Sequence, residues 1–425
     1  MTRLLKGGRV VDPGAGLDKQ LDLLIENGKI TRVGGGPVPD GAEVVDLNGL
    51  VVCPGFLDMH VHLREPGQEW KETIATGTHA AAAGGFTAVA CMPNTTPVID
   101  SRAVTEMILG EARNSGVVRV HVIGCVTQAQ EGKYLAEMED MHQAGAVGFS
   151  DDGMPVESSQ MMRKALEYSR IFDVPIIDHC EDSALVDGGV IHEGEVSTRL
   201  GLKGWPGVAE DQMVQRDIQL AEYTGGHIHI AHLSTGRSAD LVRQGKQRGI
   251  KVTCEVTPHH LTLTDWAVSD YDTNAKMNPP LRTDEDRLAL LEAIADGTVD
   301  AIATDHAPHH VDEKTVEFSL APFGIVGLET AISICLDRLV RPGIIDLARM
   351  IELYTTGPSN VLRIKANSLT EGAAADITVL DLDRQYECRP EEFVSKSGNT
   401  PFSGMSFQGA PVMTIVGGEI VNDKR

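Results

Sequence analysis

The stretch Phe56-Leu57-Asp58-Met59-His60-Val61-His62-Leu63-Arg64 decides the fold, because it reads as an apolar strand that ends in His-x-His. Side chains at i and i+2 of a strand share a face and lie about 7 Å apart, so His60 and His62 should point the same way. The apolar residues beside them are expected to point away. Two imidazoles at this spacing can bind one metal ion. A His-x-His pair alone is weak evidence, because many such pairs are only partly buried histidines.

Seven further strand patterns follow this stretch, and helical patterns separate most of them. The helical patterns include residues 73–83, 158–168, 211–223 and 284–295. Strands that alternate with helices predict a parallel (β/α)8 TIM-like barrel. An open doubly wound sheet is the alternative, but no glycine-rich phosphate loop follows the first strand. The eight predicted strands are 55–62, 87–93, 119–126, 146–152, 175–181, 227–234, 252–260 and 299–306.

Both ends of the chain have a different sequence pattern, in which short predicted strands are separated by turns. Residues 21–25 and 30–33 flank an Asn-Gly turn, and residues 376–382 and 412–416 repeat the pattern. We expect the two ends to form one small β-sandwich domain. The expected boundaries are 1–53 for its N-terminal part, 54–364 for the barrel and 365–425 for its C-terminal part.

Composition narrows the classes of function. The 425 residues are 42% hydrophobic and 23% charged, which is typical of globular proteins, and the net charge of −24 argues against nucleic acid as a partner. The seven cysteines include no Cys-x-x-Cys pair, which suits a reducing cytoplasm. No apolar run approaches the roughly 20 residues of a membrane span, and the N-terminus does not resemble a signal peptide. We therefore expect a cytoplasmic protein without a membrane segment.

Residue alternation predicts which side chains point into the barrel. At the end of the fourth strand it selects Asp152 rather than Asp151 as the inward carboxylate. In the sixth strand it puts His232 on the inward face, together with the two isoleucines of that strand. His227 and His229 have the opposite parity, and we expect them to be structural.

The active groups of such barrels lie at the carboxyl ends of the strands, and six metal-ligating side chains occur there. Six are too many for one catalytic zinc ion, which usually takes three protein ligands and a water. Two ions that share a bridging carboxylate fit better, and such a pair can hold a hydroxide between them. A carboxylate beside that hydroxide can take and return a proton, so the pattern predicts hydrolysis of an amide or imide, or its reversal. Each histidine taken alone is more often structural. The six residues are His60, His62, Asp152, His179, His232 and Asp305.

The chain resembles the dihydroorotases of the cyclic amidohydrolase superfamily, and in particular the bacterial branch called type I. The resemblance implies a barrel with a β-domain from both termini, in agreement with the pattern of strands. The matching segments span most of the chain; they are residues 54–67, 92–95, 149–153, 178–181, 230–234, 255–260, 277–282, 303–309 and 324–330.

The resemblance also implies a metal arrangement. His60, His62 and Asp305 would bind one zinc ion, and His179 and His232 the other, with two ions favoured over one. In most of the superfamily a carboxylated lysine on the fourth strand bridges the ions, but Ser150 stands at that position here. The type I branch implies Asp152 as the bridge. Because an aspartate is shorter than a lysine carbamate, occupancy of both sites is a separate question.

The substrate contacts likewise follow from the resemblance. Arg64 can hold a carboxylate in a bidentate fork. Family positions that hold the carboxylate of dihydroorotate correspond to Arg64, Asn94 and His309, and those near the ring amides to Asn278, Phe323 and Gly324; His62 is also a predicted substrate contact. A surface salt bridge, a turn-forming asparagine or a solvated histidine is the alternative for each residue alone.

The implied reaction is the reversible cyclisation of N-carbamoyl-L-aspartate to L-dihydroorotate, the third step of pyrimidine synthesis. In the hydrolytic direction hydroxide attacks the ring carbonyl, while Asp305, the expected catalytic residue, takes the proton and passes it to the leaving nitrogen. Two rivals stay open. One is an allantoinase or dihydropyrimidinase, which carries the strand-four lysine, and the other is a non-catalytic partner of aspartate transcarbamoylase, which loses metal ligands.

Two further expectations concern assembly and motion. We expect a homodimer, with a complex with aspartate transcarbamoylase as an open possibility. Residues 311–324 follow the eighth strand without a clear period, and we expect them to form a mobile lid that excludes water. An ordinary surface connection is the alternative.

Overall fold

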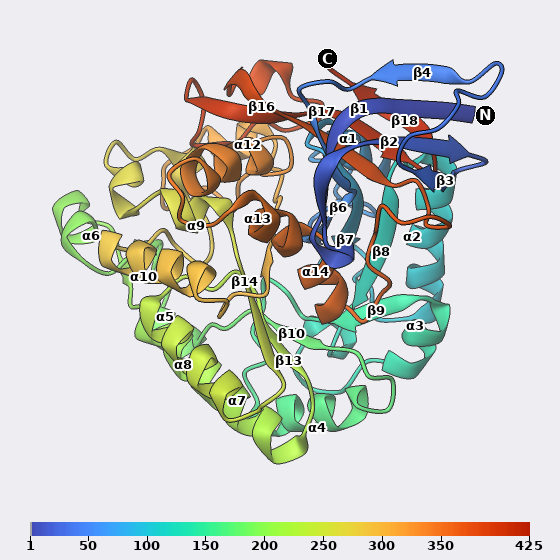
Figure 1. Ribbon diagram of the computed structural model, residues 1–425. Helices are drawn as coiled ribbons and strands as arrows, with labels where there is room; N and C mark the ends of the chain where they lie inside the picture. Colours follow the sequence, from blue (N-terminus) through green and yellow to red (C-terminus); the bar gives the residue numbers. More distant parts are fainter. Residues whose placement is uncertain (1) are drawn as a thin grey trace.

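The computed structural model describes residues 2–425 and contains a barrel of eight parallel strands beside a strand-rich layer (Figure 1). Each strand pairs with the next along the chain, and the backbone N–H of His62 donates to the carbonyl of His306 at 2.8 Å to close the ring. This confirms the predicted fold. The barrel strands are β6 (Phe56–Val61), β7 (Phe86–Cys91), β8 (Arg119–Gly124), β9 (Ala146–Phe149), β10 (Ile176–Asp178), β13 (Ile228–Ile230), β14 (Val252–Val256) and β15 (Ala301–Ile302).

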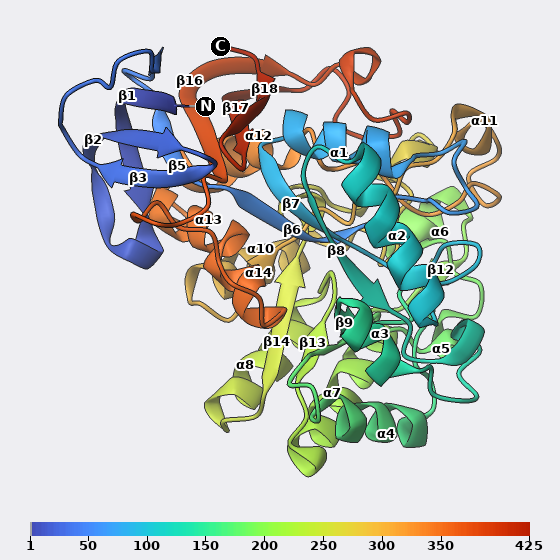
Figure 2. The same cartoon turned by 90° about the vertical axis from the view of Figure 1, so that its right-hand side faces the viewer.

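Helices surround the barrel strands on the outside (Figure 2). They include α1 (Ile74–Ala83), α2 (Arg102–Ser115), α3 (Met138–Ala144), α4 (Ser159–Ser169), α7 (Val208–Thr224), α8 (Gly236–Gln247) and α10 (Asp284–Ala295). Further elements lie in the loops and after β15: α5 (Ser183–Val186), α6 (Glu195–Leu200), α9 (Pro258–Thr262), α11 (Val311–Lys314), α12 (Ala331–Cys335), α13 (Leu347–Tyr354), α14 (Thr356–Val361), and the paired strands β11 (Ile191–His192) and β12 (Gly204–Trp205).

Three of the four predicted helices begin within one residue of the expected position, because each has a capping side chain. Thr73, Ser158 and Thr283 accept hydrogen bonds from backbone N–H groups three residues ahead, at 3.1, 3.3 and 3.2 Å. Such caps satisfy donors that the helix itself leaves unpaired. Helix α7 begins three residues before the prediction.

Strands from both ends of the chain form one sheet in the order β18-β17-β16-β5-β1-β2-β3, with β4 beside β1. Strands β5 and β16 pair antiparallel and so join the two ends. Side chains from both halves, such as Leu5, Ile25, Ile377 and Val412, share one apolar cluster, as in a sandwich. The strands are β1 (Thr2–Asp12), β2 (Leu17–Glu26), β3 (Lys29–Val33), β4 (Glu43–Asp46), β5 (Val51–Pro54), β16 (Ile377–Glu387), β17 (Ser406–Val416) and β18 (Glu419–Asp423).

The inward direction of β13 differs from the prediction. Ile228 and Ile230 pack in the outer cluster under the helices, while Ala231 belongs to the cluster inside the barrel. His229 therefore faces inward, although the alternation of residues had predicted that it faces the opposite side from the interior. His232 still reaches the mouth because the strand has ended and its φ of 31° is left-handed, which interrupts the alternation. In β6, likewise, Met59 joins the inner cluster, because the register is irregular between Asp58 and Val61.

Within residues 2–425, no helix combines the length and the apolar content needed to cross a membrane. The seven cysteines are all buried and free, as expected for a chain without a disulfide framework.

Candidate active site

The six predicted metal ligands meet at the carboxyl ends of the barrel strands. His60 lies in β6, and the other five follow the strands β6, β9, β10, β13 and β15. Their side chains come from positions far apart in the chain, yet each residue is at most 8% exposed. The structure thus brings together His60, His62, Asp152, His179, His232 and Asp305.

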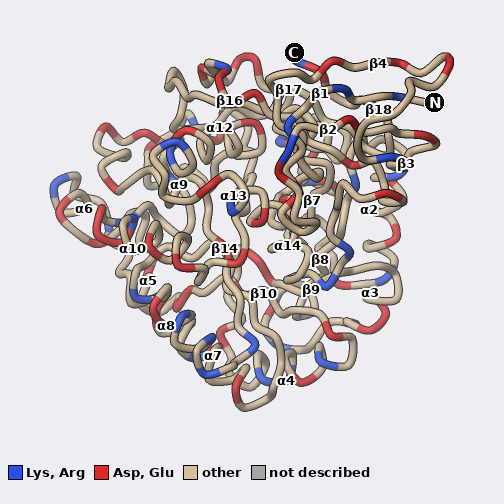
Figure 3. The backbone as a smooth tube through the Cα atoms, viewed as in Figure 1, with Lys and Arg blue, Asp and Glu red and all other residues tan. Residues whose placement is uncertain are grey.

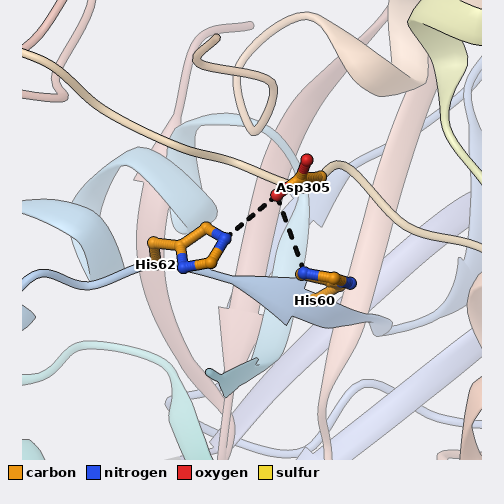
Figure 4. A group of neighbouring side chains, drawn as sticks. All are labelled: His60, His62 and Asp305. Carbon is orange, nitrogen blue, oxygen red and sulfur yellow. Dashed lines mark hydrogen bonds and ion pairs between the residues drawn. The ribbon is translucent and has the colours of Figure 1, made fainter. Parts of the chain in front are cut away.

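Asp305 and the His-x-His pair form one half of this cluster (Figure 4). The Oδ1 atom of Asp305 lies 3.0 Å from His62 Nε2 and 3.6 Å from His60 Nε2. The potential ligand atoms of these three residues all lie within 4.8 Å of one another, close enough to surround one ion.

Asp152 lies at the centre of the cluster. Its Oδ1 is 3.2 Å from His60 Nε2, 3.6 Å from His232 Nε2 and 4.0 Å from His179 Nδ1, and its Oδ2 is 3.5 Å from His62 Nε2. Burial alone would raise the pKa of this carboxyl, but the neighbouring imidazoles outweigh it and hold the pKa well below its usual range. An ionised carboxylate surrounded by imidazoles is a suitable bridging group.

Asp151 points away from the cluster and supports a loop. Its Oδ1 accepts hydrogen bonds from the backbone N–H groups of Val126 at 2.9 Å and Thr127 at 3.0 Å. This capping geometry matches the supporting role expected for it, and Asp152 is the aspartate of the two that faces the cluster.

Hydrogen bonds on the outer nitrogens fix which nitrogen each imidazole presents to the centre. The Nδ1–H of His60 donates to Glu255 Oε1 at 2.6 Å, and the Nδ1 of His62 lies 2.8 Å from Asn94 Oδ1. On the other side, the Nε2 of His179 lies 2.9 Å from Glu181 Oε2. Such partners orient metal-binding histidines.

Sequence reasoning assigned no role to Glu255 and Glu181, although both lie in segments that match the family, because their contacts with His60 and His179 appear only in the folded chain. Burial alone would raise the pKa of Glu255, but His60 and His229 outweigh it and hold the pKa below its usual value. Glu255 is fully buried, and its carboxylate stays ionised because the two histidines stabilise the charge. Its inward parity in β14 and its place in a family-matching segment were the available signals.

Backbone strain is concentrated at the same place. Arg64, His232 and Asp305 have φ values of 61°, 31° and 48°, in the left-handed region that L-residues with side chains rarely adopt. Beneath them, Asp58 accepts hydrogen bonds from Thr304 N at 3.1 Å and Thr304 Oγ1 at 2.5 Å, which ties β6 to the segment after β15. Strained residues persist where the surrounding structure holds them.

The donor atoms fit divalent cations. His60 Nε2 and Asp152 Oδ1 are buried without a hydrogen-bond partner, which is costly unless something else satisfies them. His179 Nδ1 and His232 Nε2 face each other at 2.9 Å, although Glu181 holds a proton of His179 on the opposite nitrogen. A second set of potential ligand atoms that lie within 4.8 Å of one another comes from His60, Asp152 and His232. His179 is not part of this set.

A cavity of about 350 Å³ opens above the cluster. Every predicted substrate contact lines it, whereas His60 lies beneath its floor. The predicted contacts along the wall are His62, Arg64, Asn94, Asn278, His309, Phe323 and Gly324.

The far wall of the cavity is positively charged. Burial lowers the pKa of Arg64 to about 10, so its guanidinium stays protonated near neutral pH. Burial, with Arg64 and Lys71 nearby, lowers the pKa of His309 to about 2, so this ring stays neutral. Its Nε2–H donates to Phe323 O at 2.8 Å. Arg64 therefore carries the charge that would attract a carboxylate.

The loop 311–324 beside this wall is held by two lysines. Lys314 Nζ donates to Thr273 O at 3.0 Å and Pro322 O at 2.8 Å, and Lys276 Nζ donates to Phe318 O at 2.8 Å. Residues 311–314 of the loop form helix α11. Its movement as a lid stays a prediction.

A family model described as dihydro-orotase-like matches residues 49–238. The chain is 52% identical to a dihydroorotase of Geobacter sp. strain M21 over 422 residues, which cover 99% of each protein. It is 53% identical to a dihydroorotase of Pelotomaculum thermopropionicum over 425 residues, which cover 100% of this chain and 99% of that one.

Solved structures with a similar fold include those of hydantoinases and dihydropyrimidinases. An L-hydantoinase (dihydropyrimidinase) from Arthrobacter aurescens aligns with a TM-score of 0.89 at 24% identity, over 100% of this chain and 97% of that one. A dihydropyrimidinase from Brevibacillus agri NCHU1002 aligns with a TM-score of 0.88 at 22% identity, over 100% and 96%. At these identities the likeness concerns the fold alone.

Proposed function

This chain belongs to the dihydroorotase family, and from that premise we propose that it catalyses the reversible cyclisation of N-carbamoyl-L-aspartate to L-dihydroorotate in pyrimidine synthesis. One observation carries the proposal beyond the family name. All six predicted ligands converge at one mouth, and a cavity with a buried arginine opens directly above them.

His60, His62, Asp152, His179, His232 and Asp305 would hold the metal, which we propose to be zinc, with two ions favoured over one. Four imidazoles and two carboxylates are a donor set that suits this ion. When bound, such ions lower the pKa of water and polarise a carbonyl. The protein supplies oriented imidazoles, because Glu255, Asn94 and Glu181 fix their outer nitrogens.

Asp305 is the proposed proton carrier. In hydrolysis a water oxygen adds to the ring carbonyl carbon, and Asp305 accepts the proton that the water loses. The carbon–nitrogen bond then breaks, and Asp305 returns the proton to the leaving nitrogen. Its position on the cavity wall, with Oδ1 3.0 Å from His62 Nε2, supports this role.

Arg64 is the proposed anchor for the substrate carboxylate, with Asn94 and His309 beside it. Asn278 and the backbone at Phe323 and Gly324 would contact the ring amides. Burial strengthens the attraction of Arg64 for a carboxylate, because little water competes in the cavity. Asn94 Oδ1 also lies 2.8 Å from His62 Nδ1, so the same side chain would contact the substrate carboxylate and orient a metal-binding histidine.

The rival functions are less well supported. Dihydropyrimidinases share the fold, but Ser150 stands here where most of the superfamily has its bridging lysine. In addition, two relatives that are 52% and 51% identical over 422 residues are named dihydroorotase. A non-catalytic protein would not need all six ligands. It would also not need to keep the ligand atoms His60 Nε2 and Asp152 Oδ1 buried without a hydrogen-bond partner.

The decisive experiment measures hydrolysis of dihydroorotate and of dihydrouracil by the purified chain, alone and after incubation with zinc, with metal content determined in parallel. We expect zinc-dependent turnover of dihydroorotate only. Dihydrouracil as the better substrate, or turnover of neither by metal-loaded protein, would refute the proposal.

We also propose a cytoplasmic location, consistent with seven buried free cysteines. The homodimer and the complex with aspartate transcarbamoylase stay predictions. Size-exclusion chromatography with light scattering, with and without the transcarbamoylase, tests both.

A further inference from the structure

Lys71 is a buried cation that has no part in the reaction described above. It lies in the loop between β6 and α1, and the residue is 8% exposed. Its backbone is held in place, because its N–H donates to Gln68 O at 2.9 Å and its carbonyl accepts from Ser397 Oγ at 2.8 Å. Its Nζ lies 3.3 Å from His309 Nδ1 and 3.0 Å from Glu313 Oε1. Burying an ammonium group is costly unless partners replace the water, so these two partners show where its charge acts.

The contact with Lys71 decides which nitrogen of His309 carries the proton. An ammonium group can only donate, so Nδ1 of His309 must accept. On the other side of the ring, Nε2 lies 2.8 Å from the carbonyl oxygen of Phe323, which can only accept. Burial, followed by the charges of Arg64 and Lys71, lowers the pKa of His309 to about 2, so the ring is neutral and has one proton. Both neighbours place that proton on Nε2.

The opposite tautomer of His309 conflicts with the same two distances. A proton on Nδ1 would point at the ammonium group of Lys71, and the lone pair on Nε2 would face Phe323 O. In exchange the ring would gain only long contacts. Arg64 Nη2 lies 3.5 Å from Nε2, and Glu313 Oε2 lies 3.9 Å from Nδ1, which is beyond hydrogen-bond distance.

The tautomer matters because His309 and Arg64 lie side by side on the wall of the active-site cavity. With a proton on Nε2, the wall has two neighbouring donors, and one carboxylate can accept from both. With a lone pair on Nε2, the ring would instead accept a hydrogen bond from Arg64 and repel a carboxylate.

The rest of the chain does not supply this attraction. It has 61 acidic residues against 37 basic ones, and the acidic positions are spread over the outer helices and loops (Figure 3). A negatively charged protein does not attract an anion at long range. The affinity for a substrate carboxylate must therefore come from donors at the cavity wall.

We propose that Lys71 is a positioning residue that acts through His309. By donating to Nδ1, it keeps the N–H of the ring on the side of the substrate carboxylate and leaves Arg64 free to bind that carboxylate. Glu313 of α11 compensates the buried charge of Lys71. The effect on the substrate rests on the proposed function, whereas the position of the proton does not.

Steady-state kinetics of Lys71→Met tests the effect on the substrate. The methionine keeps the length of the side chain and removes its charge and its donors. We expect KM for dihydroorotate to rise about fivefold, with kcat within about twofold of wild type. Lys71→Arg still donates, so its KM should stay within about twofold of wild type. An unchanged KM in Lys71→Met overturns the proposal.

The matched control is Lys133→Met, which breaks a lysine–glutamate pair of the same 3.0 Å length at an exposed position and should change neither constant. An equal rise of KM in this control would show that the effect is not specific to Lys71, and it overturns the proposal. Failure of the wild-type protein to turn over dihydroorotate contradicts the proposed function instead.

A double variant tests whether Lys71 acts through His309. If it does, replacing Lys71 has no further effect once the imidazole is gone. We expect KM of K71M/H309F to lie within about twofold of KM of H309F. A further rise of about fivefold in the double variant would show that Lys71 acts on the substrate directly, and it overturns the positioning role.

The position of the proton is measured without turnover, by nitrogen-15 NMR of the zinc-loaded protein labelled in its histidine rings. Signals that are missing in H309F assign His309. We expect a proton on Nε2 in the wild type and in Lys71→Arg, and a population with the proton on Nδ1 in Lys71→Met. The same tautomer in Lys71→Met as in the wild type overturns the proposal. Should Lys71→Met not fold, a proton on Nδ1 in the wild type overturns it equally.

Discussion

The two ends of this barrel use the same unusual backbone conformation for different purposes. At the amino ends of β13, β14 and β15, the left-handed positions are glycines, with φ of 69° at Gly225, 77° at Gly249 and 86° at Gly297. At the carboxyl ends they include three residues with side chains, Arg64, His232 and Asp305, beside glycines such as Gly153 and Gly324. Glycine adopts this conformation without strain, whereas the other residues cost about 1–2 kcal/mol each.

The difference shows which end carries the chemistry. Buried atoms without a hydrogen-bond partner do not distinguish the two ends, because they occur in the mouth at His60 Nε2 and Asp152 Oδ1 and at the other end at His227 Nδ1. Left-handed residues that carry side chains weaken the fold, and such strain is typical of sites that bind or react. The glycine turns at the other end avoid this strain.

The largest effect should follow from Asp305→Asn, which keeps the size of the side chain and removes its ability to carry a proton. We expect turnover to fall at least about a hundredfold, within the usual contribution of acid–base catalysis. Metal should stay bound through the histidines, which elemental analysis checks. Activity above a few per cent of wild type would refute the assigned role.

Glu255→Gln tests whether the buried support of His60 matters as much as the ligands themselves. We expect zinc affinity to fall about 10- to 100-fold, because the amide is a weaker acceptor for the His60 proton. Competition with a chromogenic chelator measures it. Glu106→Gln, on the surface of α2, is the matched control. Equal affinities for the two variants would contradict the support role.

Arg64→Lys keeps the charge on the cavity wall and removes the bidentate fork. We expect KM for dihydroorotate to rise about tenfold, equivalent to about 1.4 kcal/mol, with a smaller change in kcat. Steady-state kinetics at fixed pH separates the two constants. A pure loss of kcat would place Arg64 in the chemical step instead of substrate binding.

The smallest effect concerns the glycine turns at the other end. Gly249→Ala places a methyl group in open space, since no atom lies within 4 Å of the added Cβ, so only the φ of 77° is unfavourable. We expect the free energy of unfolding to fall by about 1 kcal/mol, with kcat and KM unchanged. Urea denaturation measures it, and a loss of activity without a loss of stability would break the contrast between the two ends.

Local patterns predicted the barrel and the strand ends at which the six candidate ligands lie, because such patterns depend on neighbours in sequence. The eight strand patterns and the caps at Thr73, Ser158 and Thr283 act over a few residues. Alternation also selected Asp152. It failed in β13, where the left-handed His232 interrupts the period of two after the strand ends. Several strands were predicted to extend too far at their carboxyl ends. The prediction counted candidate ligands as strand residues, whereas five of the six lie in the loops that follow the strands.

The sequence by itself determined that histidines and aspartates of metal-ligating type occur at the strand ends, because alternation and capping are properties of short segments. Only the tertiary structure decided which nitrogen each histidine presents. Glu255 is 195 positions from His60, yet their hydrogen bond selects the free nitrogen. The contact of Asp152 with His60 likewise exists only once the strands lie side by side, because no local pattern records the distance between two strands.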